Sequence, residues 1–389
     1  MKIMYLTPAI HNSAGTERVL SIKANYLVEN AKYQVIIVTT DQKRRDTFFH
    51  FDERIKRYDL GLNYEDDFRK NLLIKAFNHY KKNYIYKKKL KRLLAEEQPD
   101  ICVSLGGKEI EFINDLNLKC KTVFELHFSK RHIVHSISCL HPGLVWRIIA
   151  QYMNKRFVYL SKKFDTLVVL TKKDLEDWKL SNSNVVQIYN PLPYEYDEIS
   201  QLTEKNIISV GRLSVQKNFE ALINAWKIVN AKHPDWRMNV WGDGELRHKL
   251  ERQIRNNNLD RTFLLRGKTD NVYKEYLNSS AYVMSSKYEG FPMVLLEASS
   301  CGLPLISFDC ECGPSDIINN GENGFVINEG DIEGLAKAIC TVIEDKQYRK
   351  KMGENSKKNS YQYLQDKILP LWPILFEKIA KNNLFVHNA

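Results

Sequence analysis

Residues 287–312 read KYEGFPMVLLEASSCGLPLISFDCEC, and they place two carboxylates, Glu289 and Glu297, eight positions apart. A Gly-Phe-Pro turn follows Glu289, and an apolar run that suits a short helix carries Glu297. Pro292 suits the first position of that helix, and Gly302 suits the residue just past its end. We therefore expect Glu289 beside a helix start, where free backbone N–H groups and the positive end of the helix dipole attract an anion.

Glu297 is expected to be partly buried, because its sequence neighbours Val294, Leu295, Leu296 and Ala298 are apolar. A buried carboxylate needs hydrogen-bond donors, which the hydroxyl groups of a ligand can supply. The pattern thus predicts an anion site flanked by two hydroxyl acceptors, which fits the diphosphate and vicinal hydroxyls of a nucleotide sugar. Taken alone, the spacing also fits a solvated glutamate at 289 and an ordinary helix at the edge of the core.

With its flanks, this stretch resembles the E-x7-E signature of family-four retaining glycosyltransferases, which have the two-domain B-type (GT-B) fold. The flanking EGFPMVLLEA and the later GPSDIINNGENGFVI share the resemblance. It implies a hexosyltransferase-type enzyme that moves a sugar from a nucleotide diphosphate sugar, with a UDP-sugar as the first expectation. The anomeric configuration would be retained, by same-face attack in which the leaving phosphate assists the acceptor. The sequence has no D-x-D metal motif, so we expect no metal and no cofactor besides the co-substrate.

Two cations follow the strand-like run NIISV, in GRLSVQKNF (residues 211–219). Gly211 permits a tight turn, and Arg212 and Lys217 lie on the loop that opens the next helix. Arginine and lysine can bind phosphate oxygens, and fixed cations stabilise the charge that a leaving diphosphate gains. The resemblance assigns both residues to the diphosphate; two solvated loop cations are the alternative.

The first half contributes a histidine and a glycine-containing turn. His127 ends the strand-like run FELHF, and the resemblance places it near the donor sugar, to donate a hydrogen bond or stabilise developing charge. A lone histidine is otherwise more often a packed or an exposed residue. SAGTERV (residues 13–19) resembles the family's GGxER turn, with Ala14 in place of the first glycine. Gly15 and Thr16 would offer backbone amides to a phosphate there, although a plain helix N-cap fits equally well.

Two further turns complete the predicted site. WGDGE (residues 241–245) resembles the family's G-D-G-P turn, and we interpret it as mainly architectural. Lys268 follows the strand-like run TFLLR, where the family's backbone meets the nucleobase. The resemblance implies four catalytic residues, which are Glu289, His127, Lys217 and Arg212. The implied nucleotide-sugar site comprises Gly15, Thr16, Arg212, Lys217, Lys268, Glu289, Gly290, Phe291, Pro292, Met293, Val294 and Glu297.

Short apolar runs alternate with helical stretches along the whole chain, which predicts two Rossmann-like, doubly wound α/β domains facing across a cleft. A stretch with two prolines and little apolar periodicity at 190–206 fits a linker between them. The expected divisions are an acceptor-binding domain at 1–190, a linker at 191–205, a nucleotide-sugar-binding domain at 206–358, and a helical tail at 359–389 that returns to the first domain. Predicted strands lie at 2–6, 34–40, 101–105, 122–126, 166–170, 185–188, 206–210, 238–242, 262–266, 282–286, 304–308 and 324–327. Predicted helices lie near 15–30, 87–97, 145–162, 171–179, 218–231, 245–256, 271–278, 293–301 and 331–343.

The net charge of +11 belongs to the first half, where residues 1–190 hold 33 Lys and Arg against 21 Asp and Glu. Residues 191–389 hold 25 Lys and Arg against 26 Asp and Glu. The excess of cations in the first half concentrates at 75–92 and 147–163, where cations mix with aromatic and aliphatic residues. Such stretches fit three interpretations: contact with an anionic membrane surface, a solvated helix face, or nucleic-acid binding. No nucleic-acid motif accompanies them, so we expect no nucleic acid as a partner.

No signal peptide and no apolar run of membrane-spanning length is visible, and seven scattered cysteines suit reduced thiols. We expect a cytoplasmic enzyme, peripheral at the inner face of the cell membrane.

The basic first half also hints at the acceptor. A lipid-linked sugar or a glycan at the membrane face would suit it, as in the synthesis of capsule, O-antigen or a similar surface polysaccharide. Two other functions remain open for this fold, a nucleotide-sugar 2-epimerase and a non-catalytic sugar-binding subunit. An epimerase needs no acceptor, so incubation with the donor alone separates it from a transferase.

Overall fold

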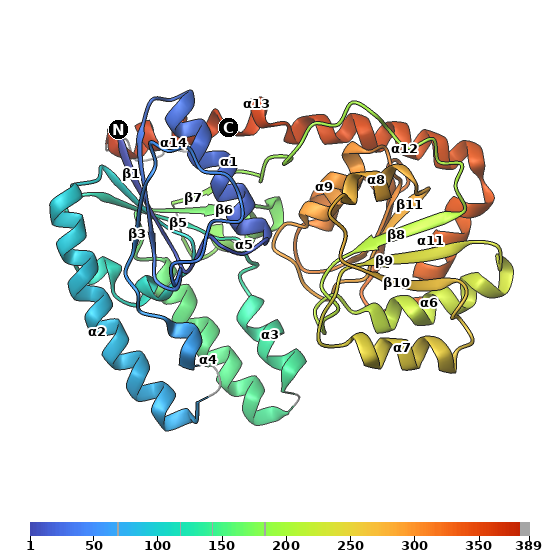
Figure 1. The fold of residues 1–389 in the computed structure, drawn as a ribbon, viewed down its shortest axis with the longest axis horizontal. Coiled ribbons are helices and arrows are strands. Elements are labelled where there is room, and N and C mark those ends of the chain that lie inside the picture. Colours follow the sequence, from blue (N-terminus) through green and yellow to red (C-terminus); the bar gives the residue numbers. More distant parts are fainter. Residues whose placement is uncertain (68–69, 117, 142, 183, 382–389) are drawn as a thin grey trace.

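Two α/β domains lie side by side in the computed structural model of the protein, which describes residues 1–67, 70–116, 118–141, 143–182 and 184–381 (Figure 1). Each domain is built on one parallel sheet, and separate apolar clusters cover the two faces of each sheet. Most of the strands are short, apolar and largely buried, because helices cover a parallel sheet on both sides. The architecture is the predicted pair of Rossmann-like domains.

The N-terminal sheet has the order β3-β2-β1-β4-β5-β6-β7, so the winding direction reverses between β1 and β4. Its core includes Ile3 and Tyr5 of β1 and Val103 of β4. The strands are β1 (Lys2–Thr7), β2 (Gln34–Thr39), β3 (Lys56–Asp59), β4 (Ile101–Ser104), β5 (Lys121–Glu125), β6 (Thr166–Val169) and β7 (Val185–Gln187). The helices are α1 (Gly15–Glu29), α2 (Leu72–Glu97), α3 (His132–Leu140), α4 (Leu144–Ser161) and α5 (Lys172–Lys179), with 3-10 turns η1 (Tyr64–Asp67), η2 (Lys108–Glu111) and η3 (Ile113–Asp115).

The second sheet repeats this winding with the order β10-β9-β8-β11-β12-β13, and its reversal lies between β8 and β11. Ligands of such sheets bind beyond the carboxyl ends of the strands at the reversal. The strands are β8 (Asn206–Val210), β9 (Arg237–Trp241), β10 (Phe263–Gly267), β11 (Ala281–Met284), β12 (Leu305–Asp309) and β13 (Gly324–Asn328). The helices are α6 (Phe219–Lys232), α7 (Arg247–Asn256), α8 (Val272–Leu277), α9 (Met293–Ser300), α10 (Pro314–Ile317), α11 (Ile332–Glu344) and α12 (Lys346–Ser360).

The end of the described chain crosses back to the first domain (Figure 1). After α12 it forms the turn η4 (Tyr361–Tyr363), the short helix α13 (Gln365–Ile368) and α14 (Leu371–Ala380). Trp372 and Phe376 of α14 are buried in the same cluster as Ile3 and Tyr5 of β1. Burial of these side chains therefore fastens the tail to the N-terminal sheet.

Several predicted elements need correction. Pro292 is not the first helical residue: it is the N-cap of α9, which begins at Met293, whereas Gly302 has the expected left-handed conformation (φ 73°) after the helix end. The helix predicted near 87–97 begins at Leu72, and β3, α3, α10 and α12 were not predicted. Strand β3 was not predicted from the sequence because three of its four residues are exposed, so it lacks the apolar pattern of a buried strand.

Candidate active site

A short ion pair at the edge of the second sheet joins two predicted site residues. Lys217 follows β8 and Glu289 follows β11, the two strands at the reversal of the second sheet. The Lys217 Nζ atom donates to Glu289 Oε1 at 2.6 Å, and both side chains are largely shielded from solvent. The fold thus brings an ammonium and a carboxylate, 72 residues apart in sequence, to one point beside the start of α9.

Backbone contacts fix the loop that carries Lys217. The Lys287 N–H group donates to the Gln216 carbonyl at 2.9 Å, and the Ser285 hydroxyl donates to the Lys217 carbonyl at 2.9 Å. Gly211 lies beneath the lysine stem, because a Cβ there would meet Lys217 side-chain carbons at 3.3 Å. The loop after β8 is therefore tied to the loop after β11, and the Lys217–Glu289 pair is held in register.

The G-D-G turn supports the same loop from the other side. A Cβ on Gly242 would lie 2.0 Å from the Gly211 carbonyl oxygen, and one on Gly244 would lie 2.5 Å from that of Leu213. The Leu213 N–H group donates to the Asp243 carbonyl at 3.1 Å. These glycines permit the close backbone approach, which fits the architectural role expected of residues 241–245.

Glu297 is buried, as predicted, and both of its oxygens accept hydrogen bonds. Arg18 Nη1 of the N-terminal domain donates to Glu297 Oε1 at 2.5 Å, and the Tyr276 hydroxyl donates to Oε2 at 3.2 Å. Burial raises the pKa of Glu297, while Arg18 and Tyr276 oppose the rise. Arg18 belongs to the SAGTERV motif, but the sequence assigned it no role there. Its partner Glu297 lies 279 residues further along the chain.

The backbones of the two domains lie close together where His127 meets Gly290. A Cβ on Gly290 would lie 2.0 Å from the His127 carbonyl oxygen, so only glycine permits this approach. A cavity of about 180 Å³ adjoins this contact. Its lining comes from both domains and consists of Phe128, Ser129, His132, Ser136, Gln216, Tyr288, Glu289 and Gly290.

Glu311 joins the two domains beside this cavity. Its Oε2 atom accepts from the Ser129 hydroxyl at 3.0 Å and lies 2.8 Å from His135 Nε2. The hydrogen bond to Glu311 raises the pKa of His135. The carboxylate therefore links α3 and the loop before it to the loop after β12.

His127 is buried and faces a carboxylate that sequence reasoning missed. Its Nε2 atom lies 3.1 Å from Glu125 Oε1, and Glu125 also contacts the ammonium of the buried Lys23. Burial opposes ionisation of Glu125, yet Lys23 and His127 hold its pKa down to about 2. Lys23 Nζ lies in turn 3.8 Å from the ring centroid of Trp372 on α14. A chain of contacts thus runs from the tail to His127, and no local sequence pattern indicates it.

The remaining predicted residues lie around this centre with fewer contacts. Arg212 and Lys268 are exposed, and neither side chain has a hydrogen bond or ion pair within the described ranges. Gly15 is the first residue of α1 and lies against Met293, because a Cβ there would be 3.5 Å from its Cγ. Thr16 follows Gly15 in the first turn of α1, while Gly290, Phe291, Pro292, Met293 and Val294 form the approach to α9 and its first turn.

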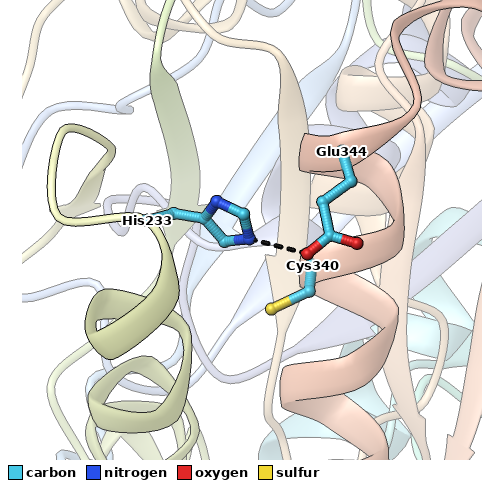
Figure 2. A group of neighbouring side chains, drawn as sticks. All are labelled: His233, Cys340 and Glu344. Atoms are coloured by element: carbon cyan, nitrogen blue, oxygen red, sulfur yellow. Dashed lines mark hydrogen bonds and ion pairs between the residues drawn. The ribbon is translucent and has the colours of Figure 1, made fainter.

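One group of possible metal ligands was found in the described part of the chain, and it lies away from this centre. Figure 2 shows His233 at the end of α6 and Cys340 and Glu344 on α11, with ligand atoms within 4.8 Å of one another. His233 Nε2 lies 2.9 Å from Glu344 Oε1, so the contact joins two helices of the second domain. All seven cysteines are free, including the close pair Cys310 and Cys312.

Comparison with known proteins agrees with this fold. Residues 195–359 match the family described as glycosyl transferases group 1. The chain is 27% identical over 381 residues to the amylovoran biosynthesis glycosyltransferase AmsD of Erwinia amylovora, covering 95% of this chain and 98% of AmsD. It is 25% identical over 388 residues to a Campylobacter jejuni protein, covering 97% and 99% of the two chains. That protein is named GalNAc-alpha-(1->4)-GalNAc-alpha-(1->3)-diNAcBac-PP-undecaprenol alpha-1,4-N-acetyl-D-galactosaminyltransferase.

A solved structure shares the whole fold. It is a Staphylococcus aureus TarM mutant in complex with fondaparinux, alpha-GlcNAc-glycerol and UDP. It superposes with a TM-score of 0.77 at 16% identity, over 96% of this chain and 99% of that one. The chain thus has two paired, doubly wound domains in the GT-B fold, and its second domain matches the group 1 glycosyl transferases over residues 195–359.

Proposed function

We propose that the protein transfers a sugar from a nucleotide diphosphate sugar, with a UDP-sugar as the first candidate, and retains the anomeric configuration. The Lys217–Glu289 pair at the reversal of the second sheet is the observation on which this rests. A diphosphate needs cations and backbone amides, and a sugar needs hydroxyl acceptors, and both kinds of group meet there. UDP in the similarly folded TarM complex supports the choice of nucleotide.

The two cations of the loop after β8 would act on the leaving group. Arg212 is exposed and Lys217 is positioned by Glu289, so both can face the diphosphate as it gains negative charge. Stabilisation of developing charge by preorganised groups is typically the largest part of such catalysis. Glu289 would accept from hydroxyls of the donor sugar, and Glu297 from those of the ribose.

The transition state would resemble an oxocarbenium ion, and the protein offers it a buried histidine. The Nε2 atom of His127 lies 3.1 Å from Glu125 Oε1, and the His127 backbone lies next to Gly290 of the other domain. We assign no covalent nucleophile. The leaving phosphate itself would take the proton of the acceptor hydroxyl on the face from which it departs.

The acceptor would be a glycan or a lipid-linked sugar used in surface polysaccharide synthesis. The names of the Erwinia and Campylobacter relatives, which cover this chain almost completely, support that class. The cavity between Phe128, Ser136 and Tyr288 opens beside Glu289 and would receive the acceptor hydroxyl.

A screen of nucleotide sugars by thermal shift tests the donor first, because a ligand that binds only the folded state raises the melting temperature. The best donor is then incubated with a lipid-linked acceptor, and NMR determines the anomeric configuration of the product. A retained anomer supports the proposal, and an inverted one contradicts the mechanism. Formation of a new nucleotide sugar from the donor alone would identify an epimerase instead.

A further inference from the structure

Helix α2 presents a row of apolar side chains that nothing in the described structure covers. The exposed residues Leu73, Phe77, Tyr80 and Tyr84 recur every three or four positions, so they form one stripe along the helix. Such spacing usually marks the side of a helix that packs on a core. Here Leu73 is 83% exposed and Tyr80 is 78% exposed, so the stripe faces outward.

Helix α4 presents a second set of uncovered side chains at its start. Nine of the ten residues at 144–153 are exposed, and only Ala150 is buried. The end of α3 and the start of α4 therefore stand clear of the domain. The exposed apolar residues of this segment are Leu144, Val145, Trp146, Ile148, Ile149, Tyr152 and Met153.

The two sets belong to one surface. Glu111 joins the helices, because its Oε2 atom lies 3.1 Å from His79 Nε2 of α2 and 3.5 Å from Arg156 Nη2 of α4. Figure 1 shows the first turns of α2 and α4 at the same lower edge of the N-terminal domain, away from the sheet. We call the exposed residues of 73–84 and 144–153 the tip surface. Exposed apolar patches at one edge of a domain mark interaction sites on soluble proteins.

The charged residues within the helical segments that carry the tip surface are all cations. Residues 70–95 and 132–163 hold 14 Lys and Arg and not one Asp or Glu. Several of these cations pair with acids elsewhere in the domain, as Lys82 does with Asp67. Four others, Lys75, Lys81, Arg147 and Lys155, have no ion pair among the described residues. The surface therefore offers unneutralised cations between aromatic and aliphatic side chains.

We infer that the tip surface docks on an anionic lipid bilayer. Tyrosine and tryptophan suit the interface between headgroups and acyl chains, aliphatic side chains can enter the acyl region, and the cations attract acidic headgroups. A second copy of the chain fits less well, because a symmetric contact would bring the same cations of both copies together. None of the helices within the described ranges has the length and apolar composition needed to cross a membrane, so contact is with the surface.

Helix α3 connects this surface to the cleft. It begins at His132, which lines the cavity beside Glu289, and its nine residues span about 14 Å to the tip surface. If the proposed transfer to a lipid-linked sugar is correct, a bilayer on the tip surface lies one short helix away from the reacting groups. Docking itself does not depend on that chemistry and is measured without a donor.

Co-sedimentation of the full chain with vesicles tests the inference. We expect binding to phosphatidylcholine vesicles that contain phosphatidylglycerol, strongest at low salt, and weak binding to phosphatidylcholine alone. Replacing Ile148→Glu together with Tyr152→Glu should lower the partition coefficient at least ~10-fold. Replacing Arg147→Gln together with Lys155→Gln should lower it about 25-fold, at about five-fold for each cation.

Matched variants remove the same side-chain types elsewhere. Leu180→Glu changes another exposed apolar residue of the same domain, and Lys350→Gln with Lys351→Gln removes two exposed cations of α12; both should bind vesicles like the parent. Equal binding of tip and matched variants overturns the inference, as does failure of the parent to bind. Self-association that is abolished by Ile148→Glu in analytical ultracentrifugation would identify a second copy as the occupant. An unchanged nucleotide-dependent thermal shift in the tip variants keeps this result separate from the proposed function.

Discussion

Arg18 of one domain donates to Glu297 of the other at 2.5 Å, and this contact occupies the oxygen that we expect to accept from a ribose. Arg18 lies on α1 and Glu297 on α9, so the contact joins one helix of each domain. The nucleotide sugar must therefore share the Glu297 carboxylate with Arg18, or displace the Arg18 side chain from it. Both outcomes couple nucleotide binding to the spacing of the domains.

Glu297→Gln should weaken nucleotide binding without lowering stability. Burial raises the pKa of Glu297 above its unfolded value, so the ionised carboxylate costs free energy in the folded protein at neutral pH. Glutamine removes that charge, and the melting temperature at pH 8 should stay equal or rise. The affinity for UDP should fall at least ~10-fold, because a hydrogen bond to a charged group is lost. Calorimetric titration and thermal unfolding measure the two quantities.

The exposed Glu96→Gln serves as the control for this variant, since Glu96 pairs with Arg92 on the same helix, far from Glu297 in sequence. It should change neither quantity. A Glu297→Gln protein that unfolds several degrees earlier while binding UDP normally would show that the carboxylate is structural.

Lys217→Ala and Glu289→Gln should each abolish most transfer in a folded protein. Loss of one preorganised charge-stabilising group typically costs a factor of about 10²–10³ in rate. Both side chains lie on loops at the edge of the second sheet, so the core should be unaffected. Release of UDP in the presence of acceptor measures the rate, and circular dichroism checks the fold.

Lys249→Ala supplies the matched control, because Lys249 forms a similar ion pair with Glu220 at 2.9 Å on the surface of the same domain. This variant should retain parental activity. Full activity of Lys217→Ala would remove that residue from the proposed mechanism.

The sequence allowed much of this site to be predicted because its parts sit at strand ends. Apolar runs located β8 and β11, and the glycine turn and helix start that follow them located Lys217 and Glu289. Parallel strands bring such loops to one edge of the sheet, so their proximity follows from topology. The family resemblance added the roles, which no spacing alone supplies.

Contacts between distant segments could not be predicted in this way. Lys23 and Glu125 are 102 residues apart, and both lie within stretches whose neighbours predict only a helix and a strand. The orientation of α2 could not be predicted either. Leu73, Phe77, Tyr80 and Tyr84 recur at helical spacing, which usually indicates a side packed on a core, yet they face outward.

The double variant Lys23→Met with Glu125→Gln should lose activity yet remain stable. Either single change leaves the other group charged and buried without its partner, which typically costs about 3–5 kcal/mol. Changing both removes the buried pair, so much of that loss should be recovered. His127 would still lack the Glu125 carboxylate, and kcat should fall at least ~10-fold.

Chemical denaturation of the two single variants and the double variant completes this thermodynamic cycle. Normal kcat in a stable double variant would mean that Glu125 serves only the packing of Lys23. A double variant as unstable as the singles would contradict the pairing argument.

The stability of the protein should depend on Asp174 between about pH 4 and pH 6. Asp174 is buried at the start of α5, where it accepts from the Lys130 N–H group at 3.2 Å. Burial raises the pKa of Asp174 from 3.8 to about 6, and nearby Glu311 adds to the rise. The folded protein therefore binds this proton more tightly than the unfolded chain, so stability falls as pH rises from the unfolded to the folded pKa. The loss is on the order of 3 kcal/mol and is complete above the folded pKa.

Asp174→Asn should remove this dependence, because the amide does not ionise and its oxygen can still accept from Lys130. Relative to the parent, the variant should gain free energy of unfolding as pH rises from 4 to 7, with no further gain above. Denaturant titrations at each pH measure this difference in the free energy of unfolding. The exposed Glu176→Gln on the same helix is the control, and its free energy of unfolding should follow the pH dependence of the parent. A constant difference between Asp174→Asn and the parent at every pH would show that the carboxyl does not titrate with a raised pKa. Asp174 also faces the second domain, where a hydrogen bond from the Cys312 thiol opposes the rise of the Asp174 pKa. Ionisation of Asp174 therefore changes a contact between the two domains.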